Sequence, residues 1–216
     1  MERIEFENGD VYEGETLNGV FHGNGTLTQK NGTTYQGEFF AGKKHGKGKW
    51  TWIDGTVFEG EFFCDELHGN GQITWSYGKI LKGEFFAGVL HGNGEINEED
   101  GSLLSGEFFC GRLHGEAKEF LSDGTVYEGK MVDGKYHGDG RLVFSNDDVY
   151  EGDFFDGKMT GYGKLTCNED GTYEGRFLDG DLHGIGKYTT KDGEEIEGQF
   201  INGILASSHN NVNKKE

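Results

Sequence analysis

Seven of the eight histidines in this 216-residue chain fall in one column of a 23-residue spacing, with Thr160 in the gap: His22, His45, His68, His91, His114, His137 and His183. Imidazoles in a row suggest metal binding or a charge change near neutral pH. If each repeat is a strand pair, equivalent histidines lie about 9–10 Å apart, whereas two imidazoles on one zinc need nitrogens roughly 3.5 Å apart. A shared metal is therefore excluded. We interpret the histidines as turn-flanking residues that hydrogen-bond the backbone, and a pH response is the alternative.

The other residue patterns do not support a phosphate-binding or catalytic site. Glycine-rich stretches such as HGNG lack the strand–loop–helix context and the Lys-Ser/Thr of a phosphate loop. No helix is expected, so no helix N-terminus can hold an anion. A repeat gives every residue several equivalents, and no Ser or Cys stands beside a particular His and carboxylate. We therefore expect no enzyme activity, no catalytic residue, no metal and no cofactor.

Composition and charge narrow the class further. Glycine supplies 40 of the 216 residues, roughly 19% against an average of about 7%. Proline is absent, which suits a chain whose backbone N–H groups serve in hydrogen-bond ladders. The net charge of -19 disfavours nucleic acid and acidic lipid, and favours basic partners or plain solubility. The start lacks an apolar signal core, and no apolar run approaches the ~18 residues of a membrane helix. The three cysteines, Cys64, Cys110 and Cys167, are odd in number and far apart, so a cytoplasmic setting is expected.

The elements that must position the histidines are repeats of 23 residues. With Tyr12 as position 0, the equivalent residues are Tyr35, Phe58, Leu81, Leu104, Tyr127, Tyr150, Tyr173 and Ile196. Glycine occupies position 2 in every copy and recurs at positions 11 and 13, where Ala117 is an exception. The spacing predicts one continuous array, with a half repeat at 1–11, eight full repeats at 12–195, a terminal half repeat at 196–203 and a polar tail at 204–216.

Each repeat is predicted to be a β-hairpin. Two segments alternate with period two, and the Asn-Gly and Asp-Gly pairs between repeats are hairpin turns. The fold class is therefore all-β, an elongated single-layer antiparallel meander of about eighteen strands. Position 0 should pair with position 15, as in Tyr35 with Trp50, and position 1 with position 14, as in Glu128 with Arg141. Charge swaps also favour pairing of Glu38 with Lys47 and of Lys130 with Asp139.

Paired glycines explain why the tyrosine face needs no second layer. Gly129 and Gly140 are opposite each other under this register, so a neighbouring ring can lie flat across the bare backbone. Such repeats are stacking units whose stability depends on their nearest neighbours.

At this point the sequence resembles a known family. Tyr-Glu-Gly-x-Phe, then Gly, His-Gly-x-Gly and Asp-Gly on a 23-residue period is similar to the MORN (membrane occupation and recognition nexus) repeat over residues 1–203. The resemblance implies a curved sheet with an aromatic groove, and scaffolds that bind a helical segment there. It also implies settings in cilia, flagella or membrane–cytoskeleton junctions, dimers formed through terminal repeats, and a suggested affinity for phospholipid.

Two candidate interaction surfaces follow. The first is the aromatic groove, which a helix or an extended peptide could complete; its residues are Tyr12, Tyr35, Phe39, Trp50, Trp52, Phe58, Phe62, Trp75, Phe85, Phe108, Tyr127, Tyr150, Phe154 and Tyr173. The second is an apolar row at position 5, where the family pattern is polar; it includes Phe40, Phe63, Phe86, Phe109 and Phe155. That row is either a ladder packed against Leu67, Leu90 and Leu113 or a second stripe for a partner or self-association.

The sequence thus predicts a non-enzymatic scaffold that binds a protein partner in the aromatic groove, at a cytoskeletal, ciliary or membrane-adjacent assembly. The alternatives are a peripheral module that binds phosphoinositides, a regulatory module for a separate enzyme, and a structural homodimer joined through the terminal repeats.

Overall fold

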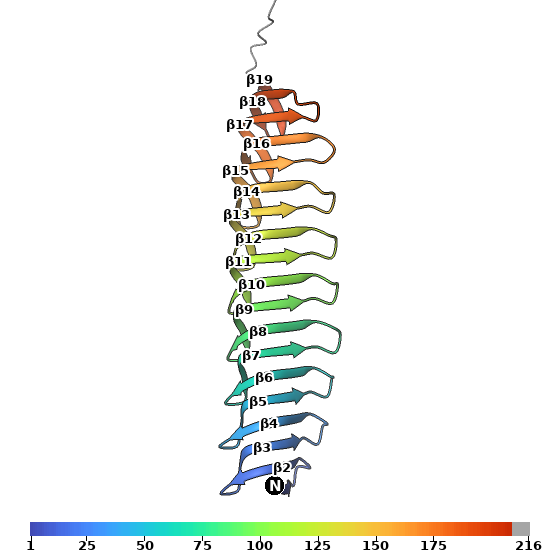
Figure 1. Cartoon of the computed structure of the whole chain (residues 1–216), viewed down its shortest axis with the longest axis vertical. Helices are drawn as coiled ribbons and strands as arrows, with labels where there is room; N and C mark the ends of the chain where they lie inside the picture. The colour runs from blue at the N-terminus through green and yellow to red at the C-terminus, as the bar shows by residue number, and fades with distance from the viewer. Residues whose placement is uncertain (209–216) are drawn as a thin grey trace, which may run out of the picture. The chain divides into compact units, whose positions relative to one another are not determined.

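The structure is a set of antiparallel β-hairpins. This computed structural model describes residues 1–208, which contain nineteen strands and no helix (Figure 1). The chain divides into two compact units, Met1–Arg112 and the residues from Leu113 onward. Within each unit every strand pairs antiparallel with the strand that precedes it in the chain. The predicted all-β hairpin meander is confirmed.

Most repeats contribute a seven-residue strand followed by a nine-residue strand. The strands of the first unit are β1 (Glu2–Glu5), β2 (Val11–Leu17), β3 (Val20–Thr28), β4 (Thr34–Phe40), β5 (Lys43–Thr51), β6 (Val57–Phe63), β7 (Glu66–Thr74), β8 (Ile80–Phe86), β9 (Val89–Asn97) and β10 (Leu103–Phe109). β11 (Arg112–Phe120) begins at the last residue of the first unit and otherwise belongs to the second. The other strands of the second unit are β12 (Val126–Val132), β13 (Lys135–Val143), β14 (Val149–Phe155), β15 (Lys158–Thr166), β16 (Gly171–Leu178), β17 (Asp181–Thr190), β18 (Glu195–Ile201) and β19 (Ile204–Ser208). Because the described residues form no helix, none of them forms a membrane-spanning helix.

The predicted register holds over the first half of each hairpin. Tyr35 is opposite Trp50, and Glu128 is opposite Arg141. The salt bridge of Arg141 nevertheless forms with Glu151 on the following strand, at 3.2 Å between Nε and Oε1. Lys49 pairs with Glu59 and Lys118 with Glu128 in the same way, so these charges join successive hairpins.

The register shifts at the glycine that follows each histidine, which corrects two predicted charge pairs. Glu38 is opposite His45 and not Lys47, and the same shift after Gly129 removes the pairing of Lys130 with Asp139. The cause is a β-bulge, at which Gly46 has a φ of 59° and Gly138 a φ of 62°. The Glu38 carboxylate accepts a hydrogen bond from the Lys47 N–H at 2.9 Å, so it caps the bulge that the sequence reading missed.

Tyrosine rings lie across the paired glycines, as predicted. A Cβ atom added to Gly140 would come within 2.6–2.9 Å of the Tyr127 ring and hydroxyl. The Tyr127 hydroxyl donates a hydrogen bond to the Lys130 carbonyl at 2.7 Å, which fixes the ring in place. Each such tyrosine therefore covers backbone that no other layer shields.

The array continues further than predicted at its C-terminal end. β19 occupies the first part of the expected polar tail and pairs with β18, because Leu205 takes the apolar position opposite Phe200. The remaining tail residues, 209–216, lie outside the described part of the chain. Joining of two copies through the terminal strands stays a prediction.

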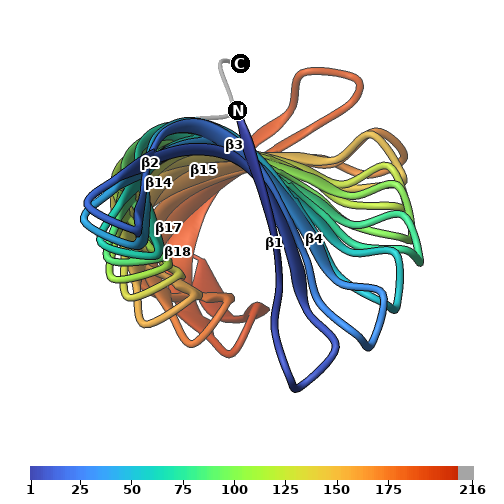
Figure 2. The same ribbon diagram turned by 90° about the horizontal axis from the view of Figure 1, so that it is seen from below.

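The sheet twists along each unit. Viewed from below, the hairpin tips of the first unit, coloured blue to green, fan out one after another instead of lying in register (Figure 2). This is the accumulated right-handed strand twist of an antiparallel sheet.

Replacing Gly140 by alanine should test the role of the covering ring. We expect Gly140→Ala to lower the free energy of unfolding by about 1–3 kcal/mol, because the methyl group would overpack against Tyr127. In a Tyr127→Leu background the same change should cost less, since position 0 is already leucine in two repeats. Urea unfolding followed by circular dichroism measures both costs. Equal costs in the two backgrounds would show that the ring does not impose the glycine.

Candidate partner-binding surfaces

Most of the predicted aromatic groove is the core of the protein. Nine of its residues expose less than 5% of their surface: Tyr12, Tyr35, Phe39, Phe62, Phe85, Phe108, Tyr127, Tyr150 and Phe154. Four are half-buried, namely Trp50, Phe58, Trp75 and Tyr173, and Trp52 is 40% exposed. The expectation of a half-open aromatic trough is therefore wrong for the nine buried residues.

The trough is filled by side chains of the repeats themselves. Tyr35 makes edge-to-face contacts with Phe39 at 5.0 Å and with Phe62 of the next repeat at 5.3 Å between ring centroids. Tyr127 stacks on Tyr136, from position 9, at 3.7 Å. This burial raises the pKa of Tyr127 to about 12. Such rings cannot contact a partner without unfolding the hairpin.

The accessible remainder of the groove is a cluster at the loops that join repeats. We call Trp50, Trp52, Phe58, Trp75 and Tyr77 the tryptophan cluster. Ring centroids within Trp50, Trp52 and Phe58 are 5.1–5.3 Å apart, and those of Trp75 and Tyr77 are 6.4 Å apart. The two loops are adjacent, because a Cβ on Gly55 would lie 3.4 Å from the Ser76 Cβ, and exposed Ile53 adds to the apolar area.

A lysine lies beneath this cluster, at a position where the other repeats have an apolar residue. Lys44 Nζ lies 3.9 Å from the centre of the Trp50 ring and 3.7 Å from Asp65 Oδ1, and only 14% of its side chain is exposed. Burial lowers the pKa of Lys44, and Asp65 partly opposes that shift. Asp65 occupies a turn position with a φ of 76°. The equivalent residue Gly88 has the same φ, a conformation that glycine adopts without the steric cost that a side chain brings. The lysine and the aspartate are therefore a matched departure from the repeat.

The position 5 residues form a second exposed surface with the histidines. Going along the first unit, the rings alternate as His22, Phe40, His45, Phe63, His68, Phe86, His91 and Phe109, with neighbouring centroids 5.2–6.2 Å apart. The phenylalanines are 55–62% exposed, while these histidines are half-buried. We call this the Phe–His row.

This row corrects two interpretations. The phenylalanines do not pack on Leu67 and Leu90, because those leucines are buried on the opposite face, where Leu67 covers Gly71. The histidine rings pack between phenylalanines, and the Nδ1 of His183 is buried without a hydrogen-bond partner, contrary to the expected backbone bond. Among residues 1–208, no group of three or more His, Cys, Asp or Glu side chains could hold a metal ion.

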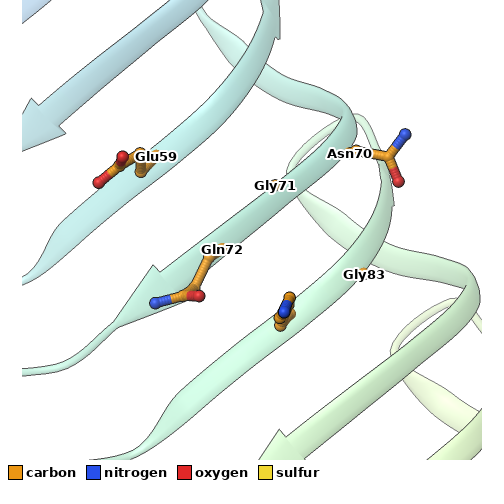
Figure 3. A pocket seen from close by; sticks show the side chains of 6 residues that line it. Glu59, Asn70, Gly71, Gln72 and Gly83 are labelled. Carbon is orange, nitrogen blue, oxygen red and sulfur yellow. The ribbon is translucent and has the colours of Figure 1, made fainter.

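The charged face carries only shallow hollows. One of about 410 Å³ lies over the backbone of Gly71 and Gly83, and Glu59, Gln72 and Lys82 border it on three successive strands (Figure 3). Its lining consists of polar side chains of mixed charge and of glycine backbone, without an apolar side chain to hold an anchor. This hollow is therefore a weaker candidate site than the tryptophan cluster.

Comparison with known proteins identifies the class. A family model for the MORN repeat matches residues 12–34, 35–57, 58–78, 82–96, 105–126, 127–149, 150–172 and 173–195. The chain therefore belongs to the MORN repeat family. No curated protein matches it.

Several solved structures are similar to the chain at low identity. The wild-type TCP10 domain of Danio rerio CPAP has 12% identity and a TM-score of 0.49, covering 96% of this chain and 98% of its own. The G-box domain of the microcephaly protein CPAP has 14% identity and a TM-score of 0.47, covering 93% and 99%. The SAS-4 TCP domain of Drosophila melanogaster, solved with a proline-rich motif of Ana2, has 10% identity and a TM-score of 0.38, covering 92% and 96%. These values carry no conclusion about function.

Sequence reasoning missed the Lys44–Asp65 pair and the alternation of rings in the Phe–His row. Both were visible as columns of the repeat. Position 9 is apolar in every other full repeat, and position 7 is glycine in every repeat but the one that contains Asp65. Phenylalanines at position 5 and histidines at position 10 recur together. The row could have been predicted if the bulge that brings both positions to one face had been recognised in the sequence.

A double-mutant cycle should reveal the coupling between Lys44 and Asp65. We expect Lys44→Leu combined with Asp65→Gly to raise the free energy of unfolding by about 1–3 kcal/mol, because apolar residues often stabilise a site more than a buried ion pair does. Asp65→Gly should be less favourable with Lys44 present than in the Lys44→Leu background, by at least about 0.5 kcal/mol, since it strips a buried ammonium of its partner. Urea unfolding of the four proteins measures this difference, and strict additivity would contradict it.

Proposed function

We propose that this protein is a non-enzymatic scaffold that binds a protein partner at the tryptophan cluster. The observation that carries the proposal is that all three tryptophans of the chain lie in this one cluster, although the repeat offers nine equivalent places. Position 17 is tryptophan in two neighbouring repeats and in no other, so the fold of a repeat does not require tryptophan there. A local departure with exposed apolar surface is what a specific contact needs.

The geometry of the cluster fits an apolar anchor from a helix or an extended segment. Trp52 and Tyr77 are 40% and 53% exposed, and Ile53 is 72% exposed. Lys44 holds one face of Trp50 from below, and Lys79 lies 5.9 Å from the Trp75 ring centre while pairing with Glu98 at 2.8 Å. The rings are thus supported from inside the protein and open to a ligand on their outer side.

The setting of this scaffold is proposed as a cytoskeletal, ciliary or membrane-adjacent assembly. The support is membership in the MORN repeat family, whose resemblance implied such settings, and a surface that favours basic protein partners over acidic lipid or nucleic acid. The net charge also opposes direct binding to anionic membranes, so a protein contact is the preferred means of attachment.

Loss of the tryptophans should abolish capture of the partner. Affinity purification from the native cell, followed by mass spectrometry, identifies proteins that bind the chain but not its Trp52→Ala/Trp75→Ala variant. With the purified partner, we expect the variant to bind at least tenfold more weakly, because aromatic anchors of this kind dominate interface energies. Binding to the unmodified chain should also shift its tryptophan emission, since every tryptophan lies in the cluster.

A matched control is available in the second unit. Tyr162 is 61% exposed and lies far from the cluster in the sequence, so Tyr162→Ala should leave the affinity unchanged. Circular dichroism and thermal unfolding establish that each variant is folded. A folded Trp52→Ala/Trp75→Ala variant that retains full affinity for every captured partner would refute the proposal.

A further inference from the structure

The Phe–His row has a second feature, a continuous acidic border in the first unit. The position 3 residues, which lie on the same strands and the same face two residues before the position 5 row, are Glu15, Glu38, Glu61, Glu84 and Glu107, and all five are exposed. The corresponding apolar residues are Leu17, Phe40, Phe63, Phe86 and Phe109. Five exposed apolar side chains thus run beside five carboxylates.

The second unit lacks this border, although it has the same repeat. There the position 3 residues are Lys130, Asp153, Arg176 and Gln199. Their charges differ in sign, so they form no continuous negative row. Phe155 still contacts a histidine, His137, at 5.1 Å. Hairpin geometry therefore does not require the glutamates, and the unbroken acidic row is a property of the first unit alone.

Two of the five carboxylates also have a structural task, which does not neutralise them. Glu38 and Glu84 accept hydrogen bonds from the backbone N–H groups of Lys47 and Asn93 at 2.9 and 3.3 Å. Asp153 does the same for Tyr162 in the second unit, at 2.9 Å. These bonds hold the carboxylates of Glu38 and Glu84 at fixed places beside the phenylalanines and leave their charge on the surface.

The spacing and winding of the row decide what kind of chain can follow it. Equivalent residues two strands apart are separated by about 9.4–9.8 Å at the backbone. The row also winds along the unit, as the fanning of the hairpin tips shows (Figure 2). A straight α-helix has a seven-residue repeat of about 10.5 Å, so its anchors fall out of step with the row by roughly 1 Å at each repeat and do not follow its winding. A β-strand would present every third side chain to alternating faces.

A polyproline II segment meets both conditions. It has three residues per turn and rises about 3.1 Å per residue, so every third side chain returns to the same face after about 9.3 Å. It makes no internal hydrogen bonds and can bend to follow a wound surface, and rows of aromatic rings are the surfaces on which such segments dock.

We propose that the Phe–His row of the first unit binds a basic polyproline II segment of another protein, with an apolar residue at every third position and Lys or Arg beside it. The apolar residues contact the phenylalanines, and the cations face the glutamate row. This site shares no residue with the tryptophan cluster, so it is a second and independent binding surface.

A peptide titration tests the proposal directly. The probe is a fluorescein-labelled peptide with Leu-Pro-Arg repeated five times, which places five leucines opposite the five apolar residues. We expect saturable binding by fluorescence anisotropy that weakens as salt rises. Peptides with the leucine spacing scrambled, or with Glu in place of Arg, should bind at least tenfold more weakly. An amphipathic helical peptide with leucines at heptad spacing serves as the competing geometry.

Two protein variants locate the site. Phe63→Ser/Phe86→Ser should weaken binding of the peptide at least tenfold, whereas the matched change Phe155→Ser in the second unit should not. Because these side chains are already more than half exposed, the variants should remain folded, which thermal unfolding checks. Glu61→Lys/Glu84→Lys should reverse the preference from the Arg peptide to the Glu peptide.

Other outcomes would overturn the proposal. No saturable binding, equal binding by Phe63→Ser/Phe86→Ser, or tighter binding of the heptad peptide would each remove the polyproline II assignment. Binding that is lost only in Trp52→Ala/Trp75→Ala would assign the peptide to the tryptophan cluster. Failure here leaves that cluster untouched, since its own test uses different variants and a different partner.

Discussion

The contact on which the rest of the structure depends is a tyrosine ring lying across two paired glycines. Tyr127 can occupy that place only because Gly129 and Gly140, opposite each other, have no side chains, and its hydroxyl then bonds the Lys130 carbonyl. In repeats without the tyrosine, a leucine such as Leu67 covers the same glycine pair. A sheet with no second layer would otherwise leave its backbone bonds open to water and its apolar face exposed. Each hairpin thus builds its core from its own residues and from those of its neighbours.

The same contact explains how far the sequence alone could predict the fold. The pairing of Tyr35 with Trp50 could be read from columns of residues, because a period of 23 fixes which side chains recur on a face. The bulge could not be predicted in this way, since Glu38 and Lys47 would be opposite each other in a hairpin with an unshifted register. The positive φ of Gly46 marks the bulge that shifts the register and places Glu38 opposite His45. Burial of the tyrosines was equally out of reach. It depends on residues at positions 4 and 9 meeting over the ring, and that meeting exists only after the bulge has changed the register.

Departures from the repeat indicate where this chain differs in function from a generic array. A residue that recurs nine times serves the hairpin, and a residue that appears once or in one unit is free to serve something else. Lys44 and Asp65 depart together, and Lys44 lies under Trp50, so a strained turn and a buried charge accompany the tryptophan cluster. Strain and buried charge reduce stability, and they are more easily understood where a surface must be positioned than where a core must be filled.

The two surfaces also lie at opposite ends of the strands. In β6, for example, Phe58 near the start belongs to the tryptophan cluster, and Phe63 at the end belongs to the Phe–His row. The buried Phe62 separates them in the core, so a ligand at one end needs no side chain from the other. A hairpin that keeps its core inside itself leaves both ends of every strand available. In the scaffold proposed above, this arrangement would let two partners bind at once without competing for the same residues.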